Sequence, residues 1–529
     1  MLVVDAASTV GGVWAEHRIY PGLRTNNIRG RYEYPDYPLD DSFGVGAGEH
    51  IPGAVVHNYL TSYAKKFGVF SRARFNTKVE SVAQGEKGGW ELRLTNVLDG
   101  KPANIKTERL VVATGLTTEP NMPVLRGADV FDAPILHAVD FAQHSELTKT
   151  AKKVVVLGGA KSAWDVAYAF ASTGAEVDMV VRQSGKGPVW MAPAYVTPFK
   201  RLLEGLVTTR FITWMSPCIW GDEDGYGRIR SFLHQTRFGR WIVDKFWWVL
   251  ENDVVQLNGY DSHPDLKTIK PWYSAFYVGN GLSIFNYPTD PLDMVRQGKI
   301  RTHVGDVDSL SPGSVNLSSG ETIKTDALLC ATGWRHRPEI DWIGMTYEEL
   351  GLPHRSSDPE PLSAEANAGI LRQFPRLKRQ PRVGHRDPEG IDRPFRLYRF
   401  MVPPSFAEER SIAFVGMMKC LATTSVAHIQ ALWISAFFDG KLDRLPTSEE
   451  EMRWQTMLHT QWVKLRYPTG HADQFPDFVF DAIPYLDMLL GDLGVRKRRK
   501  AGRIAELTDP YSPESYKDVL DEWREKKHQ

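Results

Sequence analysis

The segment from Lys152 to Arg182 constrains the fold more than any other part of this 529-residue chain. It reads KKVVVLGGAKSAWDVAYAFASTGAEVDMVVR: a β-branched strand, a glycine turn, an amphipathic helix and a second strand. Strands that alternate with a helix in this way are typical of a βαβ unit with parallel strands. The chain is therefore predicted to contain an α/β, doubly wound domain of the kind that binds dinucleotides.

The glycine turn of this unit indicates where a dinucleotide phosphate would bind. Compared with G-x-G-x-x-G/A, it keeps the first glycine, has alanine in place of the second, and has the permitted alanine at the third position. Backbone amides of the turn and the N-terminus of the following helix would bind the phosphates. The candidate contacts are Gly158, Gly159, Ala160, Lys161 and Ser162. The alternative is a turn that only allows tight packing of helix against strand.

The second strand of the unit ends at Arg182, where NAD-binding units carry an acid. A cation at this position suits a 2′-phosphate, so we expect NADPH rather than NADH. Lys161 is the second candidate cation for the same phosphate.

A second nucleotide site is suggested by VVDAASTVGGVW at residues 3–14. A short strand ends in Asp5 and is followed by the pair Gly11 and Gly12 and by Trp14. An acid at the tip of a second strand holds a ribose hydroxyl, and a glycine turn is expected about 20 residues before it. We therefore expect a strand and a G-x-G-x-x-G turn upstream of Met1, unless the chain is a degenerate copy.

The order of these segments predicts one domain inserted into another. RLVVATG (109–115) and DALLCATG (326–333) are similar strands that flank the complete βαβ unit. The predicted division is 1–148 and 326–445 for the outer domain, 149–325 for the inserted domain, and 446–529 for a helical C-terminal extension at the periphery. Residues 350–395 are rich in proline and charge, and are predicted to have little regular structure.

Composition limits the other classes of function. Lys+Arg 64 balances Asp+Glu 64, so no global field recruits nucleic acid. The three cysteines have no metal-type spacing, and we predict no metal site and a reducing compartment, the cytoplasm. No stretch is long and apolar enough for a membrane span. The aromatic segments FITWMSPCIW (211–220) and RWIVDKFWWVL (240–250) could line a cavity, pack in the core or touch a membrane surface.

Four features resemble the class B flavoprotein monooxygenases, which comprise flavin-containing monooxygenases, N-hydroxylases and Baeyer–Villiger monooxygenases. GGVW (11–14) followed by YPGLRTN (20–26) resembles the flavin-proximal loop of this family. FDAPILHAVDF (131–141) is similar to the fingerprint F-x-G-x-x-x-H-x-x-x-F/Y/W, with Ala133 in place of the glycine. The GGAKSAWD turn and the two ATG segments complete the resemblance, which covers residues 2–433.

The resemblance implies two nested Rossmann-like domains, with FAD bound by the outer one and NADPH by the inserted one. It implies that NADPH reduces FAD, that oxygen forms a C4a-hydroperoxide, and that a hydrophobic small molecule, for example a secondary metabolite, is oxygenated. His137 is expected to tune the linker between the domains. The implied FAD contacts are Asp5, Gly11, Gly12, Trp14, Thr114, Gly115 and, on a helix near the flavin, Gln430.

Asn26 is the candidate catalytic residue, because its loop resembles the one beside the reactive edge of the flavin. Baeyer–Villiger relatives usually carry Asp here, and a carboxamide can donate a hydrogen bond but cannot act as a base. We therefore expect heteroatom hydroxylation or epoxidation by an electrophilic, protonated peroxide. The alternatives are Baeyer–Villiger oxidation, a turn-forming role for Asn26, and a truncated, non-catalytic chain that binds no FAD.

Overall fold

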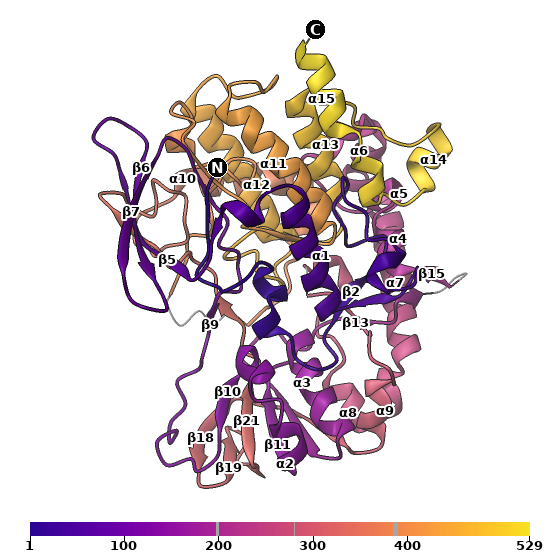
Figure 1. The fold of residues 1–529 in the computed structure, drawn as a ribbon. Helices are drawn as coiled ribbons and strands as arrows, with labels where there is room; N and C mark the ends of the chain where they lie inside the picture. The colour runs from indigo at the N-terminus through magenta and orange to yellow at the C-terminus, as the bar shows by residue number, and fades with distance from the viewer. Residues whose placement is uncertain (197–199, 280, 385–389, 529) are drawn as a thin grey trace.

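The computed structural model describes residues 1–196, 200–279, 281–384 and 390–528. A parallel sheet of five strands occupies the lower half of Figure 1, in the order β10-β21-β11-β12-β17. The predicted βαβ unit forms its centre: β11 (Lys153–Leu157), α3 (Lys161–Ser172) and β12 (Glu176–Val181). Val154, Val155 and Val156 are each 0% exposed, as expected for a strand covered on both faces.

Alternate residues of this sheet belong to two separate cores. Val154 and Val156 pack under α3, together with α8 (Pro264–Thr268) and α9 (Pro291–Arg296). Val155 and Leu157 pack on the opposite face against the antiparallel sheet of β18 (Val307–Ser311), β19 (Ser314–Leu317) and β20 (Thr322–Lys324). The period-2 alternation of side chains thus fixes the sheet between a helical layer and a small β layer.

Two strands of the parallel sheet come from outside residues 149–325. β10 (Ile135–His137) and β21 (Ala327–Cys330) pair with each other, and β21 also pairs with β11. β10 and β21 therefore belong to the same sheet as the strands of residues 149–325, which lie between them in the sequence. The remaining strand of the sheet, β17 (Ile300–Val304), pairs with β12 at the opposite edge.

The N-terminal region lies in the upper half of Figure 1, beside the antiparallel sheet of β5 (Thr77–Gln84), β6 (Trp90–Asn96) and β7 (Pro102–Thr107). Its parallel strands form three separate pairs, one of which joins β5 to β23 (Asp341–Ile343). β1 (Val3–Val4) pairs with β4 (Ala73–Arg74), and β8 (Leu110–Val112) pairs with β24 (Ile412–Phe414).

The C-terminal helices are central to the largest core, so their expected peripheral position is wrong. Nearly every residue of α13 (Ala482–Leu493) is buried, and α12 (Glu449–Arg466) packs in the same core. The two acids of α13 that suggest an exposed surface are paired: Asp487 with Arg210 at 2.5 Å, and Asp492 with Arg399 at 2.8 Å. Buried ion pairs of this kind place charged residues inside a core.

The segment 350–395 contains more regular structure than its composition predicts. α10 (Pro361–Gln373) begins at a proline and packs against α12, with Ala366 and Ile370 buried. Proline suits the first turn of a helix, where its missing amide is not needed. Within the described residues, no helix is long and apolar enough to cross a membrane.

Candidate active site

A cavity of about 580 Å³ opens at the carboxyl ends of the parallel strands. Doubly wound sheets bind their ligands at this edge. Residues that follow β11, β12 and β21 line one side, and the N-terminal segment and residues 469–474 line the other. Eight predicted site residues line it: Trp14, His137, Gly158, Gly159, Ala160, Lys161, Ser162 and Arg182.

The glycine turn leaves no room for a side chain at its first position. Gly158 has φ +151°, and a Cβ there would lie 2.6 Å from the carbonyl oxygen of Ala331. A Cβ on Gly159 would lie 3.2 Å from Val181. The backbone of the turn is therefore held against the ends of β21 and β12, and α3 begins directly after it at Lys161. Free amides at the start of a helix suit an anion.

Lys161 already interacts with other side chains of the protein, so it is not a free cation for a phosphate. Its ammonium forms an ion pair with Asp165 and lies 4.4 Å from the ring centre of Tyr287. Tyr20 and Tyr287 donate hydrogen bonds to the two carboxylate oxygens of Asp165, each at 2.8 Å. Tyr20 thereby joins the N-terminal segment to α3. Arg182 lines the same cavity from the end of β12.

His137 connects β10 to the segment after β21. Its Nδ1 accepts a hydrogen bond from the amide of Val139 at 3.2 Å, so Nε2 carries the proton and donates to the carbonyl of Gly333 at 3.0 Å. Burial lowers the pKa of His137 and favours this neutral form. These contacts are the ones expected of a linker residue.

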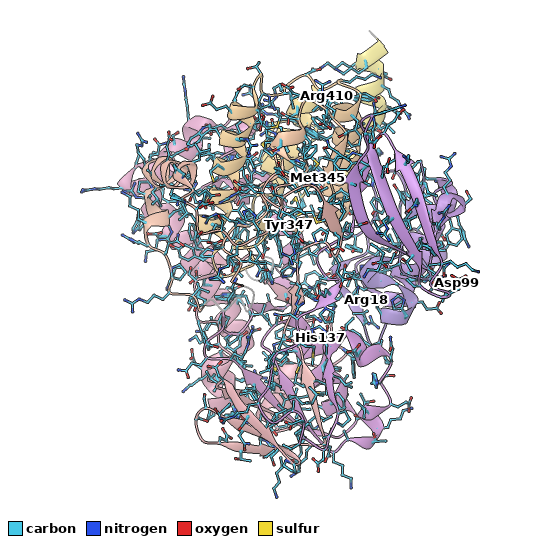
Figure 2. The ribbon with its side chains drawn as sticks, turned by 90° about the vertical axis from the view of Figure 1, so that its left-hand side faces the viewer. Arg18, Asp99, His137, Met345, Tyr347 and Arg410 are labelled. Atoms are coloured by element: carbon cyan, nitrogen blue, oxygen red, sulfur yellow. The ribbon has the colours of Figure 1, made fainter. Side chains whose placement is uncertain are left out.

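Arg18 meets the same segment from the N-terminal side. Its guanidinium lies 5.0 Å from the ring centre of Trp334 and donates to the carbonyl of Thr117 at 3.0 Å. Trp334 also contacts the ring of His137, with centroids 5.2 Å apart. Figure 2 shows Arg18 and His137 at the level where the lower sheet meets the upper half of the molecule. Both residues line the cavity at this junction.

Asn26 lies on β2 (Arg24–Ile28) and is half-buried, but it does not line the cavity. Within the described part of the chain, its carboxamide makes no side-chain hydrogen bond. Its neighbour Asn27 points to the other face of the strand and donates to Glu204 at 2.5 Å. The amide of Asn26 is therefore available to a group outside the protein.

Apart from Trp14, the other predicted FAD contacts do not line this cavity. Asp5 accepts a hydrogen bond from the amide of Ala7 at 2.9 Å, and Gly11 and Gly12 have φ +120° and +55°. Thr114 is exposed at the end of β8, next to Gly115. Gln430 is buried in the core, where it donates to Tyr485 at 2.8 Å. Trp14 alone of this group reaches the cavity, and its indole donates to Tyr32 at 2.9 Å.

Comparison with known proteins shows the family. Residues 42–212 match a family described as pyridine nucleotide-disulphide oxidoreductase. An FAD-dependent monooxygenase, resA of Aspergillus sclerotiorum, is 31% identical over 99% of this chain and 93% of its own length. An FAD-dependent monooxygenase of Pyrenophora dematioidea is 33% identical over 96% of this chain and 95% of its own length. The chain belongs to the FAD-dependent monooxygenases.

Solved structures confirm the fold of this monooxygenase. Cyclohexanone monooxygenase from Rhodococcus sp. Phi1, bound to NADP+, has a TM-score of 0.58 at 15% identity over 93% of this chain and 92% of its own. Polycyclic ketone monooxygenase from Thermothelomyces thermophila has a TM-score of 0.57 at 14% identity over 93% and 82%. The predictions of a class B flavin monooxygenase, of an enzyme and of a two-domain α/β fold are confirmed.

In the monooxygenase, two residues of the inserted segment hold the strand that carries Asn26. Glu204, on α4 (Leu203–Val207), accepts the hydrogen bond from Asn27. Asn286 donates to the carbonyls of Arg24 and Thr25 at 3.1 and 3.0 Å. Glu204 and Asn286 are each 8% exposed. Sequence analysis missed both, because they lie more than 170 residues from the strand they contact and belong to no motif.

Of these two contact residues, Glu204 carries a carboxyl group whose pKa lies near neutrality. Burial raises its pKa to about 7, although the hydrogen bond from Asn27 and the charge of Arg31 oppose the increase. Loss of solvation favours the neutral carboxyl, and the hydrogen bonds from Asn27 and from the backbone of Ile28 do not offset it. The contact between the inserted segment and β2 therefore changes charge in the physiological range.

A polar group at the opposite end of the cavity was also missed. His336 and His471 have ring centroids 5.3 Å apart, and Lys419 lies 5.2 Å from the ring centre of Phe475. Lys186 forms an ion pair with Asp473 at 3.0 Å. Burial lowers the pKa of His336 to about 3 and also lowers the pKa of Lys419. These side chains come from four distant segments, so no local pattern could reveal them.

Proposed function

We propose that this monooxygenase uses FAD and NADPH to oxygenate a hydrophobic small molecule, such as a secondary metabolite, at a heteroatom or an alkene. The observation that carries the proposal is the cavity at the strand ends, which brings the glycine turn, Arg182 and His137 together. The compartment that we propose is the cytoplasm, because Cys218, Cys330 and Cys420 are free and buried.

The residues of the cavity fit NADPH. The turn from Gly158 to Ser162 presents backbone amides at the start of α3, and Gly158 has no space for a Cβ. Arg182 would hold the 2′-phosphate, which favours NADPH over NADH. The contribution of Lys161 would be reduced, because Asp165 already pairs with its ammonium.

The residues of the N-terminal region fit part of FAD. Asp5 would hold the ribose, while Gly11, Gly12, Thr114 and Gly115 would lie along the cofactor. When bound, FAD reduced by NADPH supplies the activation of oxygen, and one oxygen atom passes to the substrate.

Asn26 sets the type of reaction in this proposal. Its carboxamide cannot take up a proton near neutral pH, so it can donate a hydrogen bond to a neutral peroxide but cannot deprotonate it to a nucleophilic oxygen anion. Glu204 holds the side chain of the neighbouring Asn27, and Asn286 holds the backbone carbonyls of the same strand. His137 stays neutral and joins the two ATG-bearing segments, so we assign it to positioning rather than to proton transfer.

The test offers three substrates to the purified enzyme with FAD, NADPH and oxygen: a thioether, an alkene-bearing polyketide and a cyclic ketone. We expect a sulfoxide or an epoxide as the main product by mass spectrometry. Asn26→Ala should lower the ratio of product to hydrogen peroxide by roughly fivefold to tenfold, because one hydrogen bond is lost.

Asn26→Asp is the matched control, since it keeps the size and removes the donor. A lactone as the dominant product of the unmodified enzyme would contradict the assignment and favour Baeyer–Villiger oxidation. An unchanged ratio of product to peroxide in both variants would show that Asn26 does not act on the reacting oxygen.

A further inference from the structure

The helical hairpin of α6 (Gly227–Gln235) and α7 (Arg237–Asn258) exposes an apolar face. Figure 1 shows α7 on the right-hand flank of the molecule. Phe238 and Trp241 stack on this face with ring centroids 5.7 Å apart, and Phe232 lies 6.4 Å from Phe238. The α7 patch comprises Ile229 (38% exposed), Phe232 (44%), Phe238 (62%), Trp241 (54%), Trp248 (57%) and Val249 (55%).

The patch is not the core-facing side of the helix. Val243, Trp247 and Val254 form that side and are almost fully buried, and the indole of Trp247 donates to the carbonyl of Met215 at 2.9 Å. Positions 238, 241, 245, 248 and 249 fall on the opposite face at 3.6 residues per turn. The buried face of α7 already supplies its contacts with the core. Folding therefore does not explain why the exposed face of α7 is also apolar.

The exposed charged residues of α6 and α7 are cations, whereas the acids of α7, namely Asp244, Glu251 and Asp253, are half-buried. Arg228, Arg237 and Lys245 are exposed on the two helices, and the ammonium of Lys245 lies 5.1 Å from the ring centre of Trp248. Asp244 forms an ion pair with Arg376 at 2.5 Å. The neighbouring segment adds three exposed cations, namely Arg372, Lys378 and Arg379. Asp222 is an exposed acid just before α6.

We propose that the α7 patch docks on an anionic lipid surface. Tryptophan and phenylalanine on a helix that also carries exposed cations are typical of helices that lie in the plane of a membrane. Tryptophan in particular favours the level of the lipid headgroups. Arg237 and Lys245 would meet acidic headgroups while the rings of Trp241 and Trp248 enter the boundary region.

The patch is connected to the entrance of the cavity. Glu251, one turn beyond Trp248, accepts a hydrogen bond from Ser274. Trp272 and Tyr273 directly precede Ser274 and line the cavity, with Trp272 37% exposed. The helix that carries the patch therefore contacts a segment that lines the cavity. The docking itself does not rest on the proposed function.

The experiment is flotation of the full chain with vesicles of phosphatidylcholine, with or without phosphatidylserine. We expect the chain to float with the anionic vesicles and to bind the neutral vesicles more weakly. Trp241→Ser with Trp248→Ser should lower the bound fraction on both by roughly tenfold or more. Lys245→Gln should lower it roughly fivefold on anionic vesicles only, at about 1 kcal/mol per cation.

Leu98→Ser and Ile504→Ser are the matched controls, because these side chains are 76% and 81% exposed outside the patch. Equal loss of binding in the controls, or no flotation with either vesicle, would overturn the proposal. A dimer in light scattering that Trp241→Ser with Trp248→Ser converts to a monomer would assign the patch to a second copy of the chain instead. Lys245→Gln keeps the test valid if the tryptophan variant does not fold.

Discussion

The inserted sheet and the N-terminal strands differ in how completely they are paired. β11 has a parallel partner on each side, and its central Val155 is 0% exposed. β8 pairs with β24 alone among the described strands, and its central Val111 is 45% exposed. Leu2, just before β1, is 46% exposed. One sheet is therefore complete within the described chain, and the other strands retain open edges.

The difference indicates which contacts stabilise the strands of each region. The inserted sheet has a local unit at its centre, because β11 and β12 pair across a single helix, and the distant strands β21 and β17 add to this unit on either side. β1 and β8 have no such local unit, since β8 pairs with the distant β24, and β2 of the same region is contacted by the distant Glu204 and Asn286. A strand with an open edge is held by fewer hydrogen bonds and less burial, and it opens more easily.

Hydrogen exchange should show the largest effect. Amides of β11 and β12 should exchange at least about a thousandfold more slowly than those of β1 and β8, because core strands open only with the whole domain. Mass spectrometry of peptides from the two regions measures the ratio. FAD should slow exchange in residues 3–5 and 110–115 if it binds there. Equal protection from hydrogen exchange in both regions, measured without FAD, would contradict the expected difference in their stability.

Alanine at a glycine should cost more in the inserted region than in the N-terminal region. Gly158→Ala should lower the free energy of unfolding by about 3–5 kcal/mol, because its Cβ meets the carbonyl of Ala331 and the backbone is strained. Gly12→Ala is the matched control, with φ +55° and no atom within 4 Å of the added Cβ. It should cost about 1–2 kcal/mol. Similar losses in thermal unfolding would show that the two turns are equally constrained.

Glu204→Gln tests the contact at which the inserted segment meets β2. The pKa of Glu204 rises from 4.5 to about 7 on folding, so the folded chain holds the extra proton between these values. The free energy of unfolding of the parent should therefore fall as pH rises from about 4.5 to 7, by on the order of 3 kcal/mol. Glu204→Gln should lack this decrease in denaturant titrations. Parallel curves for the two proteins would mean that Glu204 is ionised throughout.

Arg182→Ala tests whether the inserted region determines the preference for NADPH over NADH. The affinity for NADPH should fall roughly tenfold to a hundredfold, because one charge-assisted hydrogen bond to the 2′-phosphate is lost. The affinity for NADH should hardly change. Lys161→Ala is the control and should have a smaller effect, since Asp165 already pairs with Lys161. Binding titrations that show equal losses for NADPH and NADH would contradict the assignment of Arg182.

The sequence was most informative where a motif and its partners are local. The strand, turn, helix and strand of 152–182 were predicted within a residue or two of β11, α3 and β12. The fold class follows from this unit and from the order of the motifs. The turn residues, His137 and Trp14 line one cavity, although they lie far apart in the sequence.

Other features could not be predicted, because they arise between distant segments. Asp487 and Asp492 indicate an exposed helix when read locally, yet Arg210 and Arg399 compensate them inside the core. Glu204 is an ordinary acid on a short helix until β2 packs against it. The exposed and buried faces of α7 are both apolar, so its periodicity does not reveal which side faces the core.

The most direct test of the account is a flavin spectrum of the purified chain. FAD is added, the unbound excess is removed, and NADPH is then mixed in without oxygen. The account predicts bound flavin whose absorption bleaches with NADPH faster than with NADH and returns when oxygen is admitted. A chain that retains no flavin at saturating FAD, or whose bound flavin NADPH does not reduce, would contradict it and favour a chain without catalytic activity.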